Sequence, residues 1–201
     1  MDSSRAFVLG VDLDGVVADY DGAMRDHVSK FKNIERGSIP PTKSWSLVES
    51  GWPIKDEHDY LDLHRRAVTE KRMFATMDVI PGASEALRAI SDAGVRIRIV
   101  TFRLVVNFAH QIAIADTAAF LDLHKIPYRD LCFLKDKSAL SDLDLLIDDS
   151  PSNIEAVRTQ QGQEHAMVFD QPYNQGIEGL RAYNWDDVLK EVSNRTGLNI
   201  G

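Results

Sequence analysis

Three aspartates lie close together near the start of the chain, in the segment GVDLDGVVADY at residues 10–20. Asp12 follows directly after an apolar run, residues 7–11, and Asp14 and Asp19 come two and seven positions later. Carboxylates in such a position can bind a divalent cation, and one of them can act as a nucleophile or a general acid. An acidic surface turn would have the same short sequence, so other parts of the chain must distinguish the two interpretations.

A second acidic pair, Asp148-Asp149, also follows an apolar segment, LDLLI at residues 143–147. If both apolar segments are strands of one open parallel sheet, their carboxyl ends meet at the edge where such sheets bind ligands. We therefore expect Asp12 and Asp14 to lie close to Asp148 and Asp149.

Carboxylates that converge in this way repel one another, by about 4 kcal/mol for two charges 4 Å apart at an effective dielectric constant near 20. They must either take up protons or bind a cation, and Mg²⁺ prefers oxygen ligands. A calcium-binding EF-hand loop starting at Asp12 is excluded, because its sixth position would be Val17 instead of Gly and its twelfth Ala23 instead of Glu.

Two other predicted strand ends carry groups that suit a phosphate. Thr101 ends the run VRIRIVT and offers a hydroxyl donor, while Lys135 and Lys137 follow the run LCFL and each offer a cation. Acid, hydroxyl, cation and acid pair thus follow four successive strands. This order favours a phosphate site over a chance surface turn.

The elements that must position these residues alternate along the chain. Strands are predicted at residues 7–11, 95–101, 131–134, 143–148 and 166–169, and helices at residues 81–94, 107–123, 150–158 and 184–194. Strands that alternate with helices indicate an α/β fold with a doubly wound parallel sheet.

Residues 20–80 interrupt this alternation, because they contain no clear strand. Helix-like stretches at residues 21–31 and 56–71 flank a loop rich in Pro, Ser and Trp at residues 38–53. We predict a core domain formed by residues 1–19 and 75–201, with a helical cap inserted at residues 20–74.

The composition limits the possible partners. The chain has 201 residues, a net charge of −8 and no basic stripe, so nothing in it favours binding to nucleic acid or to an anionic membrane. No signal peptide or membrane-spanning segment is evident, and the single cysteine, Cys132, cannot form an internal disulfide. We expect a cytoplasmic protein that binds a small molecule; the sequence leaves its oligomeric state open.

The order of these residues resembles the haloacid dehalogenase (HAD) superfamily of phosphohydrolases. The likeness is closer to the 5′(3′)-deoxyribonucleotidases, on the segments DLDGVVADYDGAM, FATMDVIPGASEAL, DLLIDDSPSNI and VFDQPYN. It covers residues 7–19 and 74–174 and implies a Rossmann-like HAD core with a small cap after the first strand.

The resemblance implies a role for each motif residue. Asp12 would be the nucleophile and Asp14 the general acid and base, while Thr101 and Lys137 would hold the phosphoryl group. We prefer Lys137 to Lys135 because it stands in Asp-Lys-Ser, eleven residues before the acidic pair.

The same likeness implies a magnesium site. Its ligands would be Asp12, the backbone carbonyl of Asp14, and Asp149, with Asp148 in support. Gly15 would permit the tight turn that brings both acids of the motif to one centre.

The cap residues are candidates for contact with a base. Tyr20, Trp45 and Phe74 could stack on it, whereas Trp52 is more typical of the cap's own small core. Arg103 is a further candidate, because the Phe-Arg that follows Thr101 replaces the Ser-Pro of the mammalian relatives.

The expected function is therefore a magnesium-dependent phosphomonoesterase that acts on nucleoside 5′-monophosphates, above all those of deoxyribonucleosides, through an aspartyl-phosphate. The alternatives are a HAD phosphatase for another small phosphate, such as a sugar phosphate, and a non-catalytic phosphate-binding domain.

Overall fold

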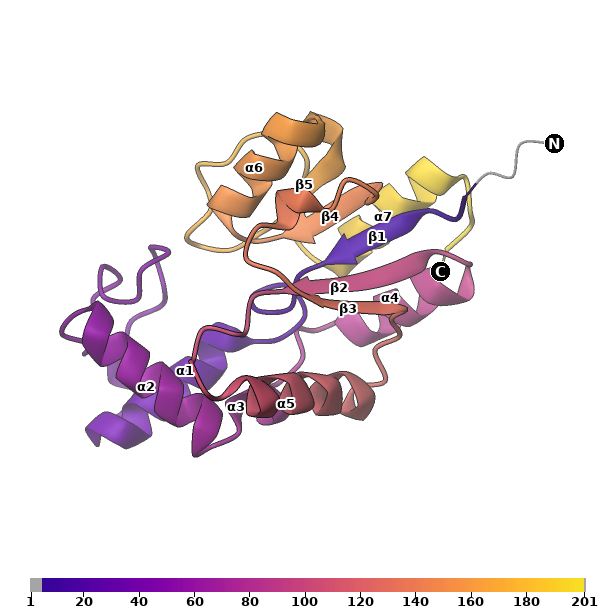
Figure 1. Ribbon diagram of the computed structural model, residues 1–201. Helices are drawn as coiled ribbons and strands as arrows, with labels where there is room; N and C mark the ends of the chain where they lie inside the picture. Colours follow the sequence, from indigo (N-terminus) through magenta and orange to yellow (C-terminus); the bar gives the residue numbers. More distant parts are fainter. Residues whose placement is uncertain (1–4, 201) are drawn as a thin grey trace.

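The computed structural model describes residues 5–200, and a six-stranded parallel sheet lies at its centre (Figure 1). The strands lie in the order β3-β2-β1-β4-β5-β6. Their bounds are β1 Val8–Val11, β2 Arg96–Thr101, β3 Asp130–Phe133, β4 Leu145–Asp148, β5 Ala166–Phe169 and β6 Arg181–Ala182. The α/β prediction and its five strands are confirmed. The sequence missed β6, because two residues are too few to show a strand pattern.

Within residues 5–200, six α-helices and three 3₁₀ turns connect the strands, and a seventh α-helix follows the last strand. The helices are α1 Tyr20–Lys32, α2 Glu57–Thr69, α3 Met73–Thr76, α4 Ala83–Asp92, α5 His110–Leu123, α6 Pro151–Gln161 and α7 Trp185–Thr196. The 3₁₀ turns are η1 Arg36–Ser38, η2 Lys137–Ala139 and η3 Gln163–His165. Between residues 5 and 200, none of the helices has the length and hydropathy needed to span a membrane.

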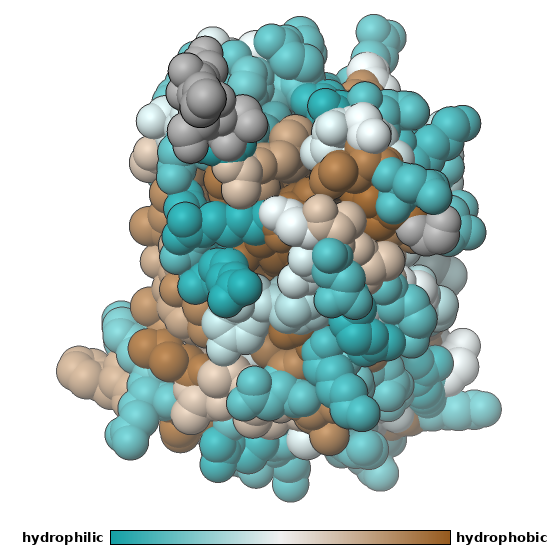
Figure 2. Space-filling model, turned by 90° about the vertical axis from the view of Figure 1, so that its right-hand side faces the viewer, coloured by the Kyte–Doolittle hydropathy of each residue, from teal (hydrophilic) through white to brown (hydrophobic). Residues whose placement is uncertain are grey.

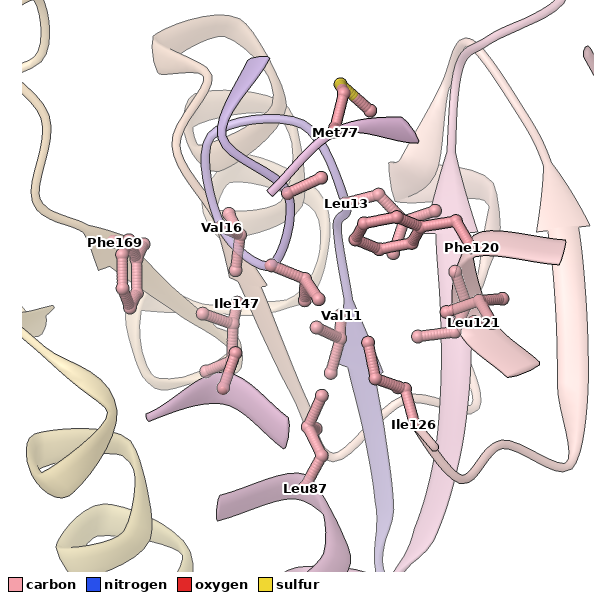
Figure 3. Close-up of a cluster of buried hydrophobic side chains, with 14 of the residues drawn as sticks. Val11, Leu13, Val16, Met77, Leu87, Phe120, Leu121, Ile126, Ile147 and Phe169 are labelled. Atoms are coloured by element: carbon pink, nitrogen blue, oxygen red, sulfur yellow. The ribbon is translucent and has the colours of Figure 1, made fainter. Parts of the chain in front are cut away.

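Helices cover both faces of the sheet. On one face α6 packs Ile154 and Val157 against Leu146 of β4. The other face packs against α4, α5 and α7, and Figure 3 shows this larger cluster with Leu87 of α4 and Phe120 of α5 pointing into it. The central strands β1 and β4 are buried along their whole length, which explains their near-continuous apolar sequences.

The predicted insertion leaves the sheet and returns to it at adjacent points. The Asp19 amide donates to the Asp78 carbonyl (2.9 Å), and the Ile80 amide donates to the Val17 carbonyl (2.8 Å). Between these points the chain forms α1, η1, α2 and α3, with α1 packed on α2 and α3 packed on α5. In Figure 1, α1 and α2 lie on the side toward which β1 points. The terminal residues 1–4 and 201 of the predicted core lie outside the described chain.

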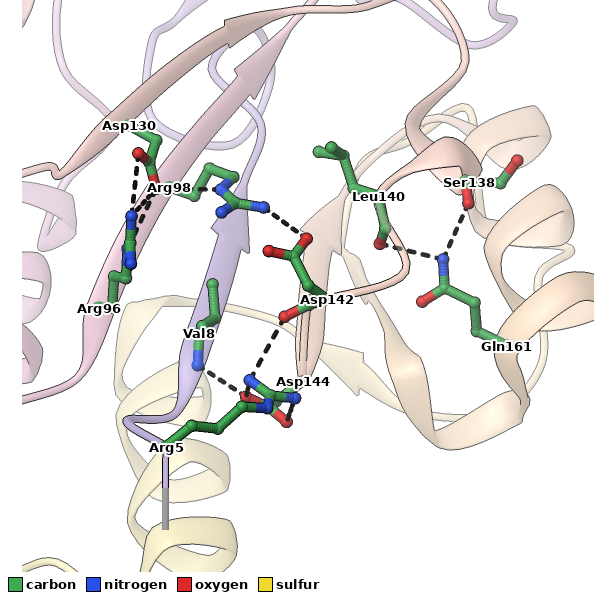
Figure 4. A network of polar contacts seen from close by, with 10 residues as sticks. All are labelled: Arg5, Val8, Arg96, Arg98, Asp130, Ser138, Leu140, Asp142, Asp144 and Gln161. Atoms are coloured by element: carbon green, nitrogen blue, oxygen red, sulfur yellow. Dashed lines mark hydrogen bonds and ion pairs between the residues drawn. The ribbon is translucent and has the colours of Figure 1, made fainter. Parts of the chain in front are cut away.

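The edge where the strands begin carries a network of ion pairs (Figure 4). The pairs are Arg5 with Asp144, Arg96 with Asp130, and Arg98 with Asp130 and Asp142. We call these six residues the amino-edge network; they carry three positive and three negative charges. Figure 2 faces this end of the molecule, and hydrophilic residues cover much of it, with hydrophobic ones showing between them.

Candidate active site

The polar residues at the carboxyl ends of the strands line one cleft of about 510 Å³. Asp12 follows β1, Thr101 ends β2, Lys137 begins η2 after β3, and Asp149 follows β4. All four line the cleft. The structure therefore brings together the groups that the sequence suggested for a phosphate site.

Three carboxylates form a cluster at the floor of this cleft. Asp12, Asp148 and Asp149 each offer one oxygen, and these oxygens lie within 4.8 Å of one another. All three residues are buried. The Lys137 Nζ lies 2.6 Å from Asp12 Oδ1 and 2.6 Å from Asp148 Oδ2, so one ammonium group pairs with two of the three carboxylates.

The excess negative charge changes the acidity of the cluster. Burial, together with the charges of Asp148 and Asp14, raises the pKa of Asp12 to about 7, although Lys137 opposes the shift. Burial, together with the charges of Asp12 and Asp148, raises the pKa of Asp149. Burial alone would lower the pKa of Lys137, but the two carboxylates beside it raise that pKa above its usual value. The cluster therefore suits a divalent cation, which would neutralise the remaining charge.

Asp148 lies behind the other two carboxylates. Its oxygens accept hydrogen bonds from Lys137 Nζ (2.6 Å), the Ser150 amide (2.8 Å) and Asn153 Nδ2 (3.1 Å). It is fully buried and does not line the cleft. Asp148 is thus placed to hold Lys137 against Asp12.

Asp14 lies outside the carboxylate cluster, because its side chain turns to Arg103. Arg103 Nε and Nη2 donate to the two Asp14 oxygens at 3.0 and 2.7 Å, and Nη1 donates to Thr117 at 3.1 Å. The guanidinium lies 4.5 Å from the centre of the Phe74 ring. The Arg103 side chain has no exposed surface, so the structure does not support it as a substrate contact. The sequence could not show that α5 and Phe74 enclose it.

Thr101 and the two lysines differ in their availability. Thr101 is buried, and its hydroxyl has no hydrogen-bond partner within the described chain, so it can donate to a ligand in the cleft. Lys137 reaches the carboxylate cluster, whereas Lys135 is exposed on the wall of the cleft. Of the two lysines, Lys137 is thus the one within hydrogen-bond distance of the carboxylate cluster.

The cap side of the cleft is aromatic. Tyr20 hydrogen-bonds the Tyr60 hydroxyl (2.8 Å) and His64 Nδ1 (2.9 Å), and Phe74 packs against the His64 ring. Burial lowers the pKa of His64 to about 4, so the imidazole is neutral at pH 7. Trp45 also lines the cleft but is 58% exposed. Trp52, in contrast, is buried in the hydrophobic cluster, as expected for a core residue.

The sequence indicated no role for the residues after β5, although they contact the motif loops. The Tyr173 hydroxyl donates to Asp149 Oδ2, the Asn174 side chain donates to the Asp149 carbonyl (2.9 Å), and the Gln171 side chain donates to the Gly15 carbonyl (2.7 Å). The signal that could have indicated a role for these residues was their position in the chain. These residues follow another strand of the same sheet, so the carboxyl-end rule applies to them too.

Gly15 shows how tightly the motif loop is packed. Its φ is +83°, and a Cβ built there would lie 2.2 Å from Asp149 Oδ2. The expected tight turn is present, but it does not bring both acids of the motif to one centre, because Asp14 pairs with Arg103 outside the cluster. Because Gly15 has no side chain, the Asp149 carboxylate can occupy the space beside it.

Comparisons with solved structures support the fold. A HAD family hydrolase from Deinococcus radiodurans, solved with bound phosphate and sodium, has a TM-score of 0.59 at 14% identity, over 98% of this chain and 99% of that one. A HAD hydrolase from Bacillus subtilis, bound to magnesium, has a TM-score of 0.56 at 16% identity, over 94% and 99% of the two chains.

Comparisons of sequence are more specific. The chain is 42% identical to the "Putative 5′(3′)-deoxyribonucleotidase" of Chlorobaculum tepidum, over 94% of this chain and 92% of that one. It is 24% identical to the mitochondrial 5′(3′)-deoxyribonucleotidase of Mus musculus, over 94% and 86% of the two chains. The model of the family described as 5′ nucleotidase, deoxy (pyrimidine), cytosolic type C matches residues 6–196. The chain therefore belongs to this nucleotidase family, a group of phosphoric monoester hydrolases with the HAD fold.

Proposed function

We propose that the protein is a magnesium-dependent phosphomonoesterase that hydrolyses deoxyribonucleoside 5′-monophosphates. The observation that carries the proposal is that one cleft joins a buried carboxylate cluster to an aromatic wall. The residues of this wall are Tyr20, Trp45, Tyr60 and Phe74. The cluster suits the phosphate end of a nucleotide, and the aromatic wall suits its base. The names of the family and of its curated relatives support the same substrate class.

The donor set fits Mg²⁺. Asp12 and Asp149 would hold the ion together with the backbone carbonyl of Asp14, and Asp148 would support them from behind. All of these donors are oxygens, and Lys137 offsets only one of the three carboxylate charges in the cluster. When bound, Mg²⁺ would reduce the repulsion between the carboxylate nucleophile and the phosphate.

In the first step, a carboxylate oxygen of Asp12 attacks phosphorus and forms an aspartyl-phosphate, while the bond from phosphorus to the ester oxygen breaks. Asp14 donates a proton to the departing alkoxide oxygen. The free hydroxyl of Thr101 and the ammonium of Lys137 hydrogen-bond the phosphoryl oxygens.

In the second step, Asp14 takes a proton from a water molecule whose oxygen attacks phosphorus. The bond from phosphorus to Asp12 breaks, which releases inorganic phosphate and restores both carboxyl groups to their starting states. Asp148 keeps Lys137 within reach of the phosphoryl group throughout both steps.

We also propose that residues 20–74 form a cap over a core built from residues 1–19 and 75–201. The adjacent exit and return points and the aromatic wall support this division. Tyr20 and Trp45 would face the nucleoside, whereas Phe74 would act mainly by covering Arg103.

A phosphate-release screen with Mg²⁺ present tests this function. We expect the fastest turnover with deoxyribonucleoside 5′-monophosphates, loss of turnover with a chelator, and recovery on addition of Mg²⁺. Faster turnover of sugar phosphates would contradict the substrate assignment but not the phosphatase chemistry. An absence of turnover with nucleotides, sugar phosphates and an aryl phosphate would contradict both.

A further inference from the structure

The segment after β5, residues 170–174, lies against both loops that carry the proposed metal ligands. From it, Tyr173 contacts Asp149, and Gln171 contacts the Gly15 carbonyl in the nucleophile loop. Tyr173 also lines the cleft. This segment is therefore in a position to set the geometry of the metal site, although the sequence assigned no role to its residues.

We propose that Tyr173 is a positioning residue that holds Asp149 in the orientation needed to bind the metal ion. This inference rests on the proposed magnesium site. The Tyr173 hydroxyl donates to Asp149 Oδ2, so one oxygen is fixed and the carboxylate plane cannot rotate freely.

Two further contacts restrict Asp149, one at its backbone and one at its carboxylate. The Asn174 side chain donates to the Asp149 carbonyl at 2.9 Å and to the Phe169 carbonyl at 2.8 Å, which ties the backbone of the ligand to the end of β5. Gly15 packs so closely that a Cβ there would meet Asp149 Oδ2 at 2.2 Å and the Tyr173 hydroxyl at 2.8 Å. The hydroxyl and the carboxylate therefore fill one confined space beside the nucleophile loop.

The ring of Tyr173 has a separate contact. Its centre lies 5.5 Å from that of Trp45, in an edge-to-face arrangement on the aromatic wall. Removal of the hydroxyl alone would leave this contact in place. Tyr173→Phe therefore separates an effect on the metal from an effect on the wall of the cleft.

Binding of Mn²⁺, followed by the loss of its free electron paramagnetic resonance signal, measures the metal site without catalysis. We expect Tyr173→Phe to raise the dissociation constant for Mn²⁺ about tenfold or more, as other changes of groups that hold metal ligands do. Tyr183→Phe is the matched control, because Tyr183 is 68% exposed and does not line the cleft. It should leave the constant within about twofold of wild type.

Mg²⁺ rescue gives the second readout. Tyr173→Phe should need more Mg²⁺ for half-maximal activity but recover most of kcat at saturating Mg²⁺, which a general structural defect would not do. A fixed, subsaturating Mg²⁺ concentration should also raise the melting temperature of Tyr173→Phe by less than that of wild type. This comparison does not depend on the melting temperature of either protein in chelator.

An unchanged Mn²⁺ constant in Tyr173→Phe would overturn the inference. A tighter constant would also overturn it, because the hydroxyl would then compete with the metal for Asp149. Asp149→Asn separates these results from a failure of the proposed function. If wild type and Asp149→Asn bind Mn²⁺ equally weakly, the metal site itself is wrong.

Discussion

The two edges of the sheet carry similar residue types in opposite arrangements. At the amino edge, three arginines pair with three aspartates, and each ion pair except that of Arg98 with Asp130 includes one well-exposed side chain. At the carboxyl edge, three buried carboxylates form one cluster, and Lys137 pairs with two of them, Asp12 and Asp148. Exposed, balanced pairs are each worth only about 0.2 to 1 kcal/mol, whereas buried, unbalanced charge is costly.

This difference indicates which edge is built for function. The positive and negative charges of the amino-edge network balance one another, so the network needs no ligand. The carboxyl edge retains negative charge and, in Thr101, a buried hydroxyl without a partner in the described chain. Such unmet groups are expected where a ligand completes the interactions.

The largest effect is expected from Asp12→Asn. An amide cannot form the aspartyl-phosphate, so turnover should fall at least about a hundredfold. The variant should melt in chelator at or above the wild-type temperature, because one buried charge is removed. Steady-state kinetics and thermal melts provide the measurements; retention of more than a few per cent of wild-type turnover would rule out Asp12 as the nucleophile.

A smaller and more selective effect is expected from Trp45→Ala. Stacking on a base is worth about 1 to 3 kcal/mol, so kcat/KM for a preferred nucleotide should fall roughly 5- to 150-fold. Turnover of glycerol phosphate should hardly change, because that ester has no base.

Phe74→Ala provides the comparison for Trp45→Ala. Phe74 covers Arg103, which holds Asp14, so its loss should slow both substrates. Equal losses on both substrates for Trp45→Ala as well would contradict its role in base recognition.

Acid should lower the free energy of unfolding through His64, which lines the cleft at the carboxyl edge. Its pKa is lowered to about 4 in the folded state, so between pH 6.5 and 4 the unfolded chain binds the proton and the folded one does not. Stability therefore rises with pH across this window, and this group should remove about 2 kcal/mol of unfolding free energy between pH 7 and pH 5.

Denaturant unfolding of wild type and His64→Gln at these two pH values isolates this contribution. The difference in unfolding free energy between wild type and His64→Gln should be about 2 kcal/mol smaller at pH 5 than at pH 7, because the variant has no imidazole to protonate at this position. A gap that is independent of pH would show that His64 titrates normally.

The smallest effect is expected at the amino edge. In the pair of Arg5 with Asp144, the side chains are 59% and 26% exposed. Arg5→Ala should therefore lower the unfolding free energy by less than about 1 kcal/mol, with activity within about twofold of wild type. A loss of activity comparable to that of Trp45→Ala would mean that the two edges are coupled.

Much of the fold was predictable because its signals are local. Apolar runs of strand length, helical spacing and the positions of Asp12, Thr101 and Asp149 after such runs can all be found in short windows of sequence. One general rule, that parallel strands present ligands at their carboxyl ends, then places these residues together. The short strand β6 escaped because it shows no such signal.

The partners of the side chains were decided by tertiary structure. Arg103 joins Asp14 across 89 positions of sequence, and Tyr173 joins Asp149 across 24. No periodicity connects such pairs, because their distances depend on how loops and the insertion pack.

The sequence by itself therefore determined the fold class, the edge that carries the site and the chemical groups gathered there. Only the tertiary structure decided that Arg103 is enclosed behind Asp14 and that Tyr173 holds Asp149. The physical reason is that hydrophobic patterning specifies which segments are buried, whereas hydrogen bonds between side chains require distances and angles that exist only after the segments have packed.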